Sequence, residues 1–266
     1  MISKLRVGIP IIGGKGWIGG VSHMELHIKA ITRLPEEERP QIYLIADNSN
    51  LINYCWYEQF INLFNGIIYV GQDVKTATTV IQRPFIHCLN EEILFNNIDF
   101  YFPVSFNVLP GRCAASWIHD FQHRYLPDFF SPQDRSIRDN LCRKIAEQAR
   151  LTFFSSYAVM NDFYHFYPHS STMAKVLSLR VYPEDEWYTG NPVIIQNKYN
   201  LPDNFILCAN QFWLHKNHRK LFEAIAILRK NNKKIHLVCT GLTYDFRNPQ
   251  HFQEIQALLK NLDIED

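Results

Sequence analysis

The sequence predicts an α/β fold with a doubly wound parallel sheet. Short, continuous apolar runs recur along the chain and alternate with helical patterns, which is typical of parallel strands covered on both faces. A strand ending in a glycine-rich turn opens the chain, and a second strand ending in a basic cluster lies far downstream. Two such strand–loop–helix units in the two halves of one chain indicate two domains with a phosphate-bearing ligand between them.

The first domain is expected to contain seven strands, over 5–12, 41–47, 66–71, 98–104, 115–119, 151–155 and 174–181. Helices are expected over 21–34, 133–150 and 156–167. The helix over 133–150 has the clearest start, because Ser131 is a favoured N-cap, Pro132 suits the first position and Asp134 follows three residues after the cap.

The pattern stops in the polar, proline-bearing stretch 182–203, which is interpreted as an interdomain connection. The expected domains are therefore 1–190 and 191–266. The second contains a strand, a helix, a strand and a helix, over 204–209, 217–231, 234–240 and 249–262. Two strands leave an α/β sheet incompletely covered, so we expect one complete Rossmann-like domain and the first half of a second.

Composition excludes several function classes. The 266 residues carry a net charge of +1, so no basic field favours nucleic acid. No apolar run approaches the roughly 20 residues that span a bilayer, and the N-terminus lacks a signal-peptide pattern. The six cysteines are scattered without a Cys-x-x-Cys pair, which is typical of reduced thiols in a cytoplasmic protein.

The glycine turn after the first strand contains two glycine pairs, Gly13 with Gly14 and Gly19 with Gly20. Glycine lets the backbone approach a ligand closely, and the following helix directs N–H groups at an anion. The pattern Gly14-x-Gly16-x-x-Gly19 also fits the dinucleotide fingerprint, with Asp47 as a ribose ligand at a longer spacing than usual. An NAD(P)-dependent sugar-nucleotide epimerase or oxidoreductase is therefore an alternative, and a plain tight turn is another.

The basic cluster starts the helix expected over 217–231 and contains Lys216, His218, Arg219 and Lys220. Cations at a helix N-terminus are disfavoured by about 0.3–1 kcal/mol each when exposed. Such a cluster is either solvated or used to bind an anion, for which phosphate is the natural candidate.

His119 closes the strand expected over 115–119, where ligands of open α/β sheets bind. The spacing His119-x-x-x-His123 is a weak metal signal, because it suits a helix and no further ligands follow. A hydrogen-bonded structural histidine is the alternative interpretation.

Two segments resemble a known family. Ser116–Ser131, SWIHDFQHRYLPDFFS, and Asn210–His218, NQFWLHKNH, are similar to motifs of nucleotide-sugar glycosyltransferases of the GT-B fold, of the retaining family four type. The resemblance implies two Rossmann-like domains facing each other across a cleft. The nucleotide-sugar donor binds mainly to the second domain, and a carbohydrate or lipid-linked acceptor binds mainly to the first. Transfer then proceeds with retention and without a metal or another cofactor.

The resemblance also assigns site residues. His119 and Asp120 match the reaction centre, and Lys216 matches the phosphate-binding lysine. Gly13, Gly14, Gly19 and Gly20 match the loop that closes on the diphosphate. Many relatives carry an arginine where this chain has Asn210, and an amide supplies no charge there.

The resemblance further implies that the family's Glu-x7-Glu region lies beyond residue 266, so a complementing C-terminal polypeptide is an expected partner. A degenerate binding module without catalysis is the third functional alternative. Aromatic side chains around 129–167 fit core packing or an acceptor or peripheral membrane contact; they are Phe129, Phe130, Phe163, Tyr164, Phe166 and Tyr167.

Overall fold

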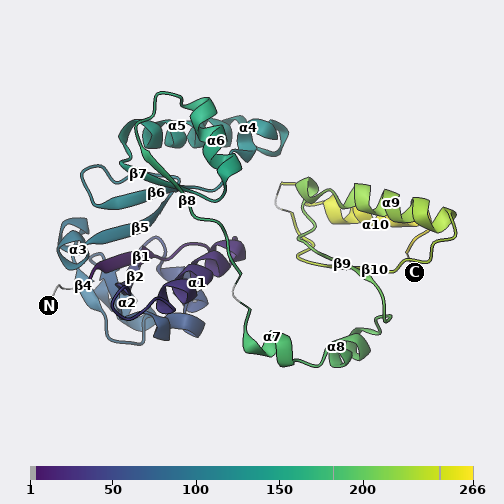
Figure 1. Cartoon of the computed structure of the whole chain (residues 1–266), viewed down its shortest axis with the longest axis horizontal. Coiled ribbons are helices and arrows are strands. Elements are labelled where there is room, and N and C mark those ends of the chain that lie inside the picture. Colours follow the sequence, from purple (N-terminus) through teal and green to yellow (C-terminus); the bar gives the residue numbers. More distant parts are fainter. Residues whose placement is uncertain (1–3, 182, 246, 266) are drawn as a thin grey trace. The chain divides into compact units, whose positions relative to one another are not determined.

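The computed structural model describes residues 4–181, 183–245 and 247–265, and Tyr182 of the expected connection lies outside them. The chain divides into two compact units, Met1–Pro183 and Glu184–Asp266 (Figure 1). Each unit is built from parallel strands and helices, and the two are described separately below.

The first unit contains one eight-stranded parallel sheet in the order β4-β3-β2-β1-β5-β6-β7-β8. Its strands are β1 (Arg6–Pro10), β2 (Gln41–Asp47), β3 (Gly66–Val70), β4 (Ile86–Cys88), β5 (Phe100–Ser105), β6 (Ala114–Ile118), β7 (Leu151–Phe154) and β8 (Met173–Val176). The chain adds strands outward from β1 in one direction as far as β4 and then returns to add β5 on the other side of β1. The predicted Rossmann-like α/β class is therefore confirmed.

Helices cover both faces of this sheet. They are α1 (Ile18–Thr32), α2 (Val74–Val80), α3 (Glu91–Asn97), α4 (Gln122–Tyr125), α5 (Pro132–Gln148) and α6 (Tyr157–Phe166), with 3-10 turns η1 (Leu51–Trp56), η2 (Glu58–Leu63) and η3 (Pro127–Phe129). One buried cluster joins α1, η1 and η2 to β1–β3, and another joins α5 and α6 to β6 and β7. The start of α5 follows the prediction, because Ser131 Oγ accepts a 3.1 Å hydrogen bond from Asp134 N.

The second unit contains a two-stranded parallel sheet packed on two amphipathic helices. The elements are β9 (Ile206–Ala209), η4 (Leu214–Lys216), α9 (His218–Lys230), β10 (Leu237–Thr240) and α10 (His251–Leu262). The buried residues of its core are Phe212, Phe222, Ile225, Ala226, Ile255 and Ile264. This strand–helix–strand–helix order is the one expected for half of a Rossmann-like domain.

The stretch 182–203 corrects the expectation of a connection without elements. It contains two short helices, α7 (Asp185–Thr189) and α8 (Pro192–Tyr199). Asn191 caps α8 by accepting a hydrogen bond from Val193 N, and Pro192 occupies the first turn. Local start signals thus form helices here although neither helix has a buried residue.

No helix among residues 4–181, 183–245 and 247–265 is both long and apolar enough to cross a membrane.

Candidate functional site

The candidate site of the first unit lies at the carboxyl ends of β1, β5 and β6. Since these strands are parallel and adjacent, their carboxyl ends share one edge of the sheet. The glycine turn follows β1, Ser105 ends β5 and His119 follows β6. The chain direction across the sheet reverses between β1 and β5, and such switch points are where open α/β sheets bind ligands.

The glycine turn requires glycine at its first position. Gly13 has φ of +81°, and a Cβ atom there would lie 2.5 Å from Trp17 O and 2.7 Å from Val21 N. Trp17 N donates to Gly14 O at 3.0 Å, which closes the turn. The backbone at Gly13 therefore lies closer to the start of α1 than a residue with a Cβ atom would permit.

The helix begins earlier than predicted, at Ile18 instead of residue 21, so Gly19 and Gly20 lie in its first turn. Trp17 is the N-cap residue and makes no side-chain capping bond. A Cβ atom on Gly20 would lie 2.7 Å from the indole of Trp17, so this glycine makes room for the ring. The second glycine pair thus permits Trp17 to fold back over the helix start.

His119 is held by contacts on several sides. Its Nε2 lies 2.9 Å from Ser105 Oγ, and its backbone carbonyl accepts a 2.5 Å hydrogen bond from Ser155 Oγ. Its ring lies edge-on to Trp117, at 3.6 Å between centroids, and to Trp17, at 5.2 Å. The structure therefore brings the glycine turn and the predicted catalytic histidine together.

Burial, together with smaller effects of the nearby His23 and Arg138, lowers the pKa of His119 to about 3. The imidazole is consequently neutral at pH 7. A neutral imidazole offers one hydrogen-bond donor and one acceptor, so His119 can orient a ligand without carrying a charge.

Asp120 contacts a cation that sequence analysis did not identify. Arg138 Nη1 lies 3.6 Å from Asp120 Oδ1, which also accepts a 3.0 Å hydrogen bond from Gln122 N. The guanidinium of Arg138 lies over the rings of Phe106 and Phe130, at 5.2 and 4.9 Å. The carboxylate thus caps the turn that leads into α4 while Arg138 supplies positive charge beside it.

Two further histidines, His23 and His27, lie on α1 beside Trp117. His23 stacks on Trp117 at 4.2 Å, and its ring is edge-on to that of His27 at 4.1 Å. Burial lowers the pKa of both to about 4, and His27 contributes to the shift of His23. Trp117 therefore contacts the rings of His23, His27 and His119, and sequence analysis identified only the last of these three histidines.

The basic cluster of the second unit is smaller than predicted. His218 is 1% exposed and stacks on Phe212 at 4.5 Å, and burial lowers its pKa. Lys220 Nζ pairs with Glu223 Oε2 at 2.8 Å. Lys216 and Arg219 are exposed. Of the four predicted cations, the structure thus turns one inward and pairs another along the helix.

Asn210 follows β9, beside the backbone that follows β10. A Cβ atom on Gly241 would lie 2.0 Å from Asn210 O, so two backbone segments meet at the carboxyl ends of the strands. The side-chain amide of Asn210 donates to Cys208 Sγ at 3.7 Å. Asn210 therefore lies at the carboxyl end of β9, and Lys216 follows in η4.

Arg247 is a cation of the second unit that sequence analysis missed. Its Nη2 lies 3.2 Å from Nδ1 of His215, and its Nε donates to Asp245 Oδ1 at 3.1 Å. The buried Asp245 also accepts a 3.0 Å hydrogen bond from Leu214 N, and these bonds hold its pKa below the usual range, although burial acts in the opposite direction. This ion pair fixes the turn that carries Lys216.

Asp47, the ribose ligand in the dinucleotide alternative, already accepts hydrogen bonds from the turn that follows it. Asp47 Oδ1 accepts hydrogen bonds from Ser49 N at 2.7 Å and Asn50 N at 3.1 Å, and Oδ2 accepts one from Asn50 Nδ2 at 3.1 Å.

The two histidines of the weak metal signal have different partners. His123 Nε2 lies 3.0 Å from Asp139 Oδ1, whereas His119 Nε2 lies 2.9 Å from Ser105 Oγ. Within the described part of the chain, no group of three or more metal-binding side chains is arranged around a common point.

The aromatic side chains around 129–167 divide between core and surface. Phe163 of α6 is fully buried in one core cluster with Phe154 of β7, whereas Tyr164 is 37% exposed. Arg124 lies over the ring of Phe166 at 4.3 Å and also donates to Asp139 Oδ1. Core packing therefore accounts for Phe163, and a surface role stays a prediction only for the exposed rings.

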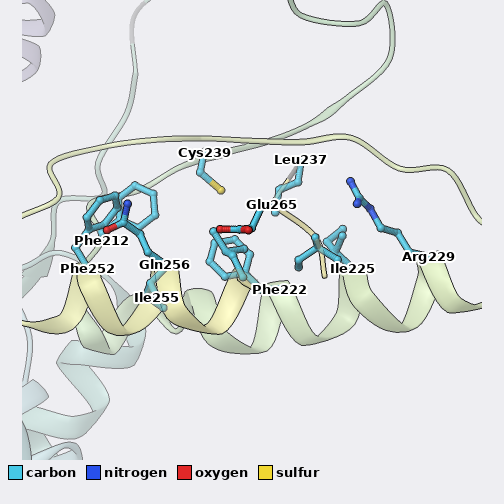
Figure 2. A pocket seen from close by; sticks show the side chains of 12 residues that line it. Phe212, Phe222, Ile225, Arg229, Leu237, Cys239, Phe252, Ile255, Gln256 and Glu265 are labelled. Atoms are coloured by element: carbon cyan, nitrogen blue, oxygen red, sulfur yellow. The ribbon is translucent and has the colours of Figure 1, made fainter. Parts of the chain in front are cut away.

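A cavity of about 270 Å³ lies within the second unit (Figure 2). Apolar side chains from α9, α10 and β10 point into it, including Phe222, Ile255 and Leu237, and the polar Arg229, Gln256 and Glu265 also line it. None of the predicted donor-binding residues lines this cavity. Its apolar lining is largely the core cluster of this unit.

The chain matches no family model and no curated protein. Among solved structures it is similar to a glycosyltransferase from Rickettsia africae, with 12% sequence identity and a TM-score of 0.48. The match covers 100% of this chain and 67% of that chain. At this identity the likeness concerns the fold alone.

Proposed function

We propose that the chain transfers a sugar from a nucleotide-sugar donor to a carbohydrate or lipid-linked acceptor, with retention of configuration. The supporting observation is that Trp17 of the glycine turn packs against the neutral His119 near the switch point between β1 and β5, where the order of strand addition reverses. A turn that brings backbone close to a ligand and a ring that donates or accepts one hydrogen bond suit a diphosphate and a sugar, respectively.

In this proposal the protein stabilises the charge of the departing nucleotide diphosphate with placed donors. Lys216 is exposed in η4, just before α9, whose N-terminus carries partial positive charge. The N-cap residue Asn217 makes no side-chain capping bond, so the helix start has no competing acceptor from that residue. His119 orients the reacting sugar, and Arg138 offsets the charge of Asp120.

The dinucleotide alternative is less well supported, because the carboxylate of Asp47 already accepts hydrogen bonds from its own turn. A ribose hydroxyl would have to compete with those donors. The non-catalytic alternative gives His119 no role in turnover. The effect of His119→Ala on turnover therefore distinguishes this alternative from a transferase.

The proposal is tested by titrating the protein with UDP-glucose, GDP-mannose and NADH while tryptophan fluorescence is followed. Trp17 lies in the glycine turn and is 41% exposed, so a bound donor should change its emission. We expect saturable changes with a nucleotide sugar, a smaller change in Trp17→Phe, and none with NADH. Saturation by NADH alone would favour the oxidoreductase, and no response to any nucleotide sugar by fluorescence or calorimetry would contradict the proposal.

A further inference from the structure

The strand β5 delivers Ser105 to His119 through an irregular register. Tyr101 of β5 pairs with Ala114 of β6, but the register shifts before Val104, and Ser105 then lies opposite Trp117. Ser105 is the last residue of β5, and Ser105 Oγ lies 2.9 Å from His119 Nε2. A regular ladder continuing from Tyr101 would pair Ser105 with Ile118 instead of Trp117.

The hydrogen bond between Ser105 and His119 can be oriented in two ways. A neutral imidazole carries its proton on one ring nitrogen and accepts on the other. If Nε2 carried the proton, the Ser105 hydroxyl would accept the hydrogen bond from Nε2. The hydroxyl would then need another acceptor for its own hydrogen. In the described residues, Ser105 Oγ has no other hydrogen-bond partner. Donation from Oγ to Nε2 is therefore the arrangement that uses both groups, and it leaves the ring proton on Nδ1.

We propose that Ser105 is a positioning residue that holds His119 in the Nδ1–H tautomer, so that His119 presents a donor to the ligand. The partner of one ring nitrogen generally determines which nitrogen is protonated. A ligand oxygen that accepts a hydrogen bond, in a phosphate or a sugar hydroxyl, then fits Nδ1. Ser155 restrains the same residue through its backbone carbonyl and leaves the ring nitrogens unaffected.

The tautomer is measured directly by long-range ¹H–¹⁵N correlation NMR on protein labelled with ¹⁵N-histidine, near pH 7. In the wild type we expect a pyrrole-type Nδ1 and a pyridine-type Nε2 for His119, assigned by its absence in His119→Gln. Ser105→Ala should shift the ring toward the Nε2–H form, and Ser105→Thr, which keeps a hydroxyl, should restore the wild-type pattern. Ser155→Ala is the matched control and should leave the tautomer unchanged.

A pyridine-type Nδ1 in the wild type, or an unchanged pattern in Ser105→Ala, would overturn the proposal. The catalytic consequence rests on the proposed function: if UDP-glucose or GDP-mannose is turned over, Ser105→Ala should lower kcat about 10-fold with KM little changed, and Ser105→Thr should recover it. If neither donor is turned over, the proposed function fails, and the NMR result still decides the tautomer. Circular dichroism of each variant shows whether the fold is retained.

Discussion

The indole of Trp17 meets the imidazole of His119 edge-on, with ring centroids 5.2 Å apart and planes inclined by 68°. Trp17 precedes α1 and His119 follows β6, so this contact reaches across the end of β5. It couples the backbone of the glycine turn to the predicted catalytic ring. A change that displaces the turn should therefore affect His119 as well.

Gly13→Ala tests the turn itself. The added Cβ would meet backbone atoms 2.5 and 2.7 Å away at a φ of +81°, so we expect the unfolding free energy to fall by about 1–3 kcal/mol. Gly16→Ala is the control, since no atom lies within 4 Å of its Cβ position, and its effect should stay within about 1 kcal/mol. Urea unfolding followed by circular dichroism compares the two. Equal effects would show that the close approach at Gly13 is unimportant.

His119→Ala separates a functional histidine from a structural one. Loss of a placed hydrogen bond should lower the turnover of a nucleotide-sugar donor about 100-fold. The thermal midpoint should fall by only a few degrees, because the aromatic neighbours of the ring can partly close the space. The control is His169→Ala, which changes an exposed histidine. A collapse of the thermal midpoint, without a specific loss of turnover, would assign His119 a structural role.

Acid should destabilise the first unit through its buried histidines, His119, His23 and His27. The pKa is about 3 for His119 and about 4 for His23 and His27 in the folded protein, against about 6.5 when unfolded, so the unfolded chain binds more protons between these values. Stability is therefore complete above about pH 6.5 and falls as the pH drops toward 4. At about pH 5, each histidine should cost about 2 kcal/mol of unfolding free energy.

The measurement for this prediction is urea unfolding at about pH 7.5 and about pH 5. His27→Gln removes one buried imidazole and should reduce the difference between the two conditions by about 2 kcal/mol. Carboxylates such as Asp99, whose pKa is lowered by Arg6, titrate at lower pH and contribute little in this window. An identical pH dependence in wild type and variant would show that His27 is not buried in its neutral form.

Lys216→Ala tests the anion site of the second unit. If Lys216 binds the donor phosphates, the variant should bind UDP-glucose or GDP-mannose more weakly by about 1.5–3 kcal/mol. Lys220→Ala is the matched control because Lys220 already pairs with Glu223 at 2.8 Å. Calorimetric titrations of both variants give the comparison. Unchanged affinity in Lys216→Ala would indicate that this lysine is only solvated.

The sequence was sufficient to predict most of the sheet, because continuous apolar runs have few other uses in a chain of this composition. β2 matches its predicted range, and the start of α5 follows from Ser131 and Pro132. The three-residue β4 was missed, since a strand this short next to Pro84 leaves no periodic signal. Helices α7 and α8 were missed because their large apolar residues are exposed, so these residues do not form a buried helical face that a periodic pattern would indicate.

The sequence predicted which strand ends carry the candidate site residues. It did not predict which side chains contact one another there. Ligand sites at the carboxyl ends of parallel strands follow from topology, and the glycine turn and His119 both lie at such ends. The partners of His119, such as Ser105, come from a neighbouring strand whose register shifts along its length, and no local sequence pattern indicates either feature. The inward rotation of His218 follows from the packing of α9 on Phe212, whereas its sequence neighbours indicated a cationic surface.

Hydrogen–deuterium exchange with and without saturating nucleotide sugar tests the central claim most directly, because it locates the ligand along the chain. We predict slower exchange in peptides covering 12–21 and 117–122 in the presence of UDP-glucose or GDP-mannose, and in the peptide covering 213–220. Protection confined to other segments, or none at a concentration where calorimetry detects binding, would contradict a donor site built on the glycine turn and His119.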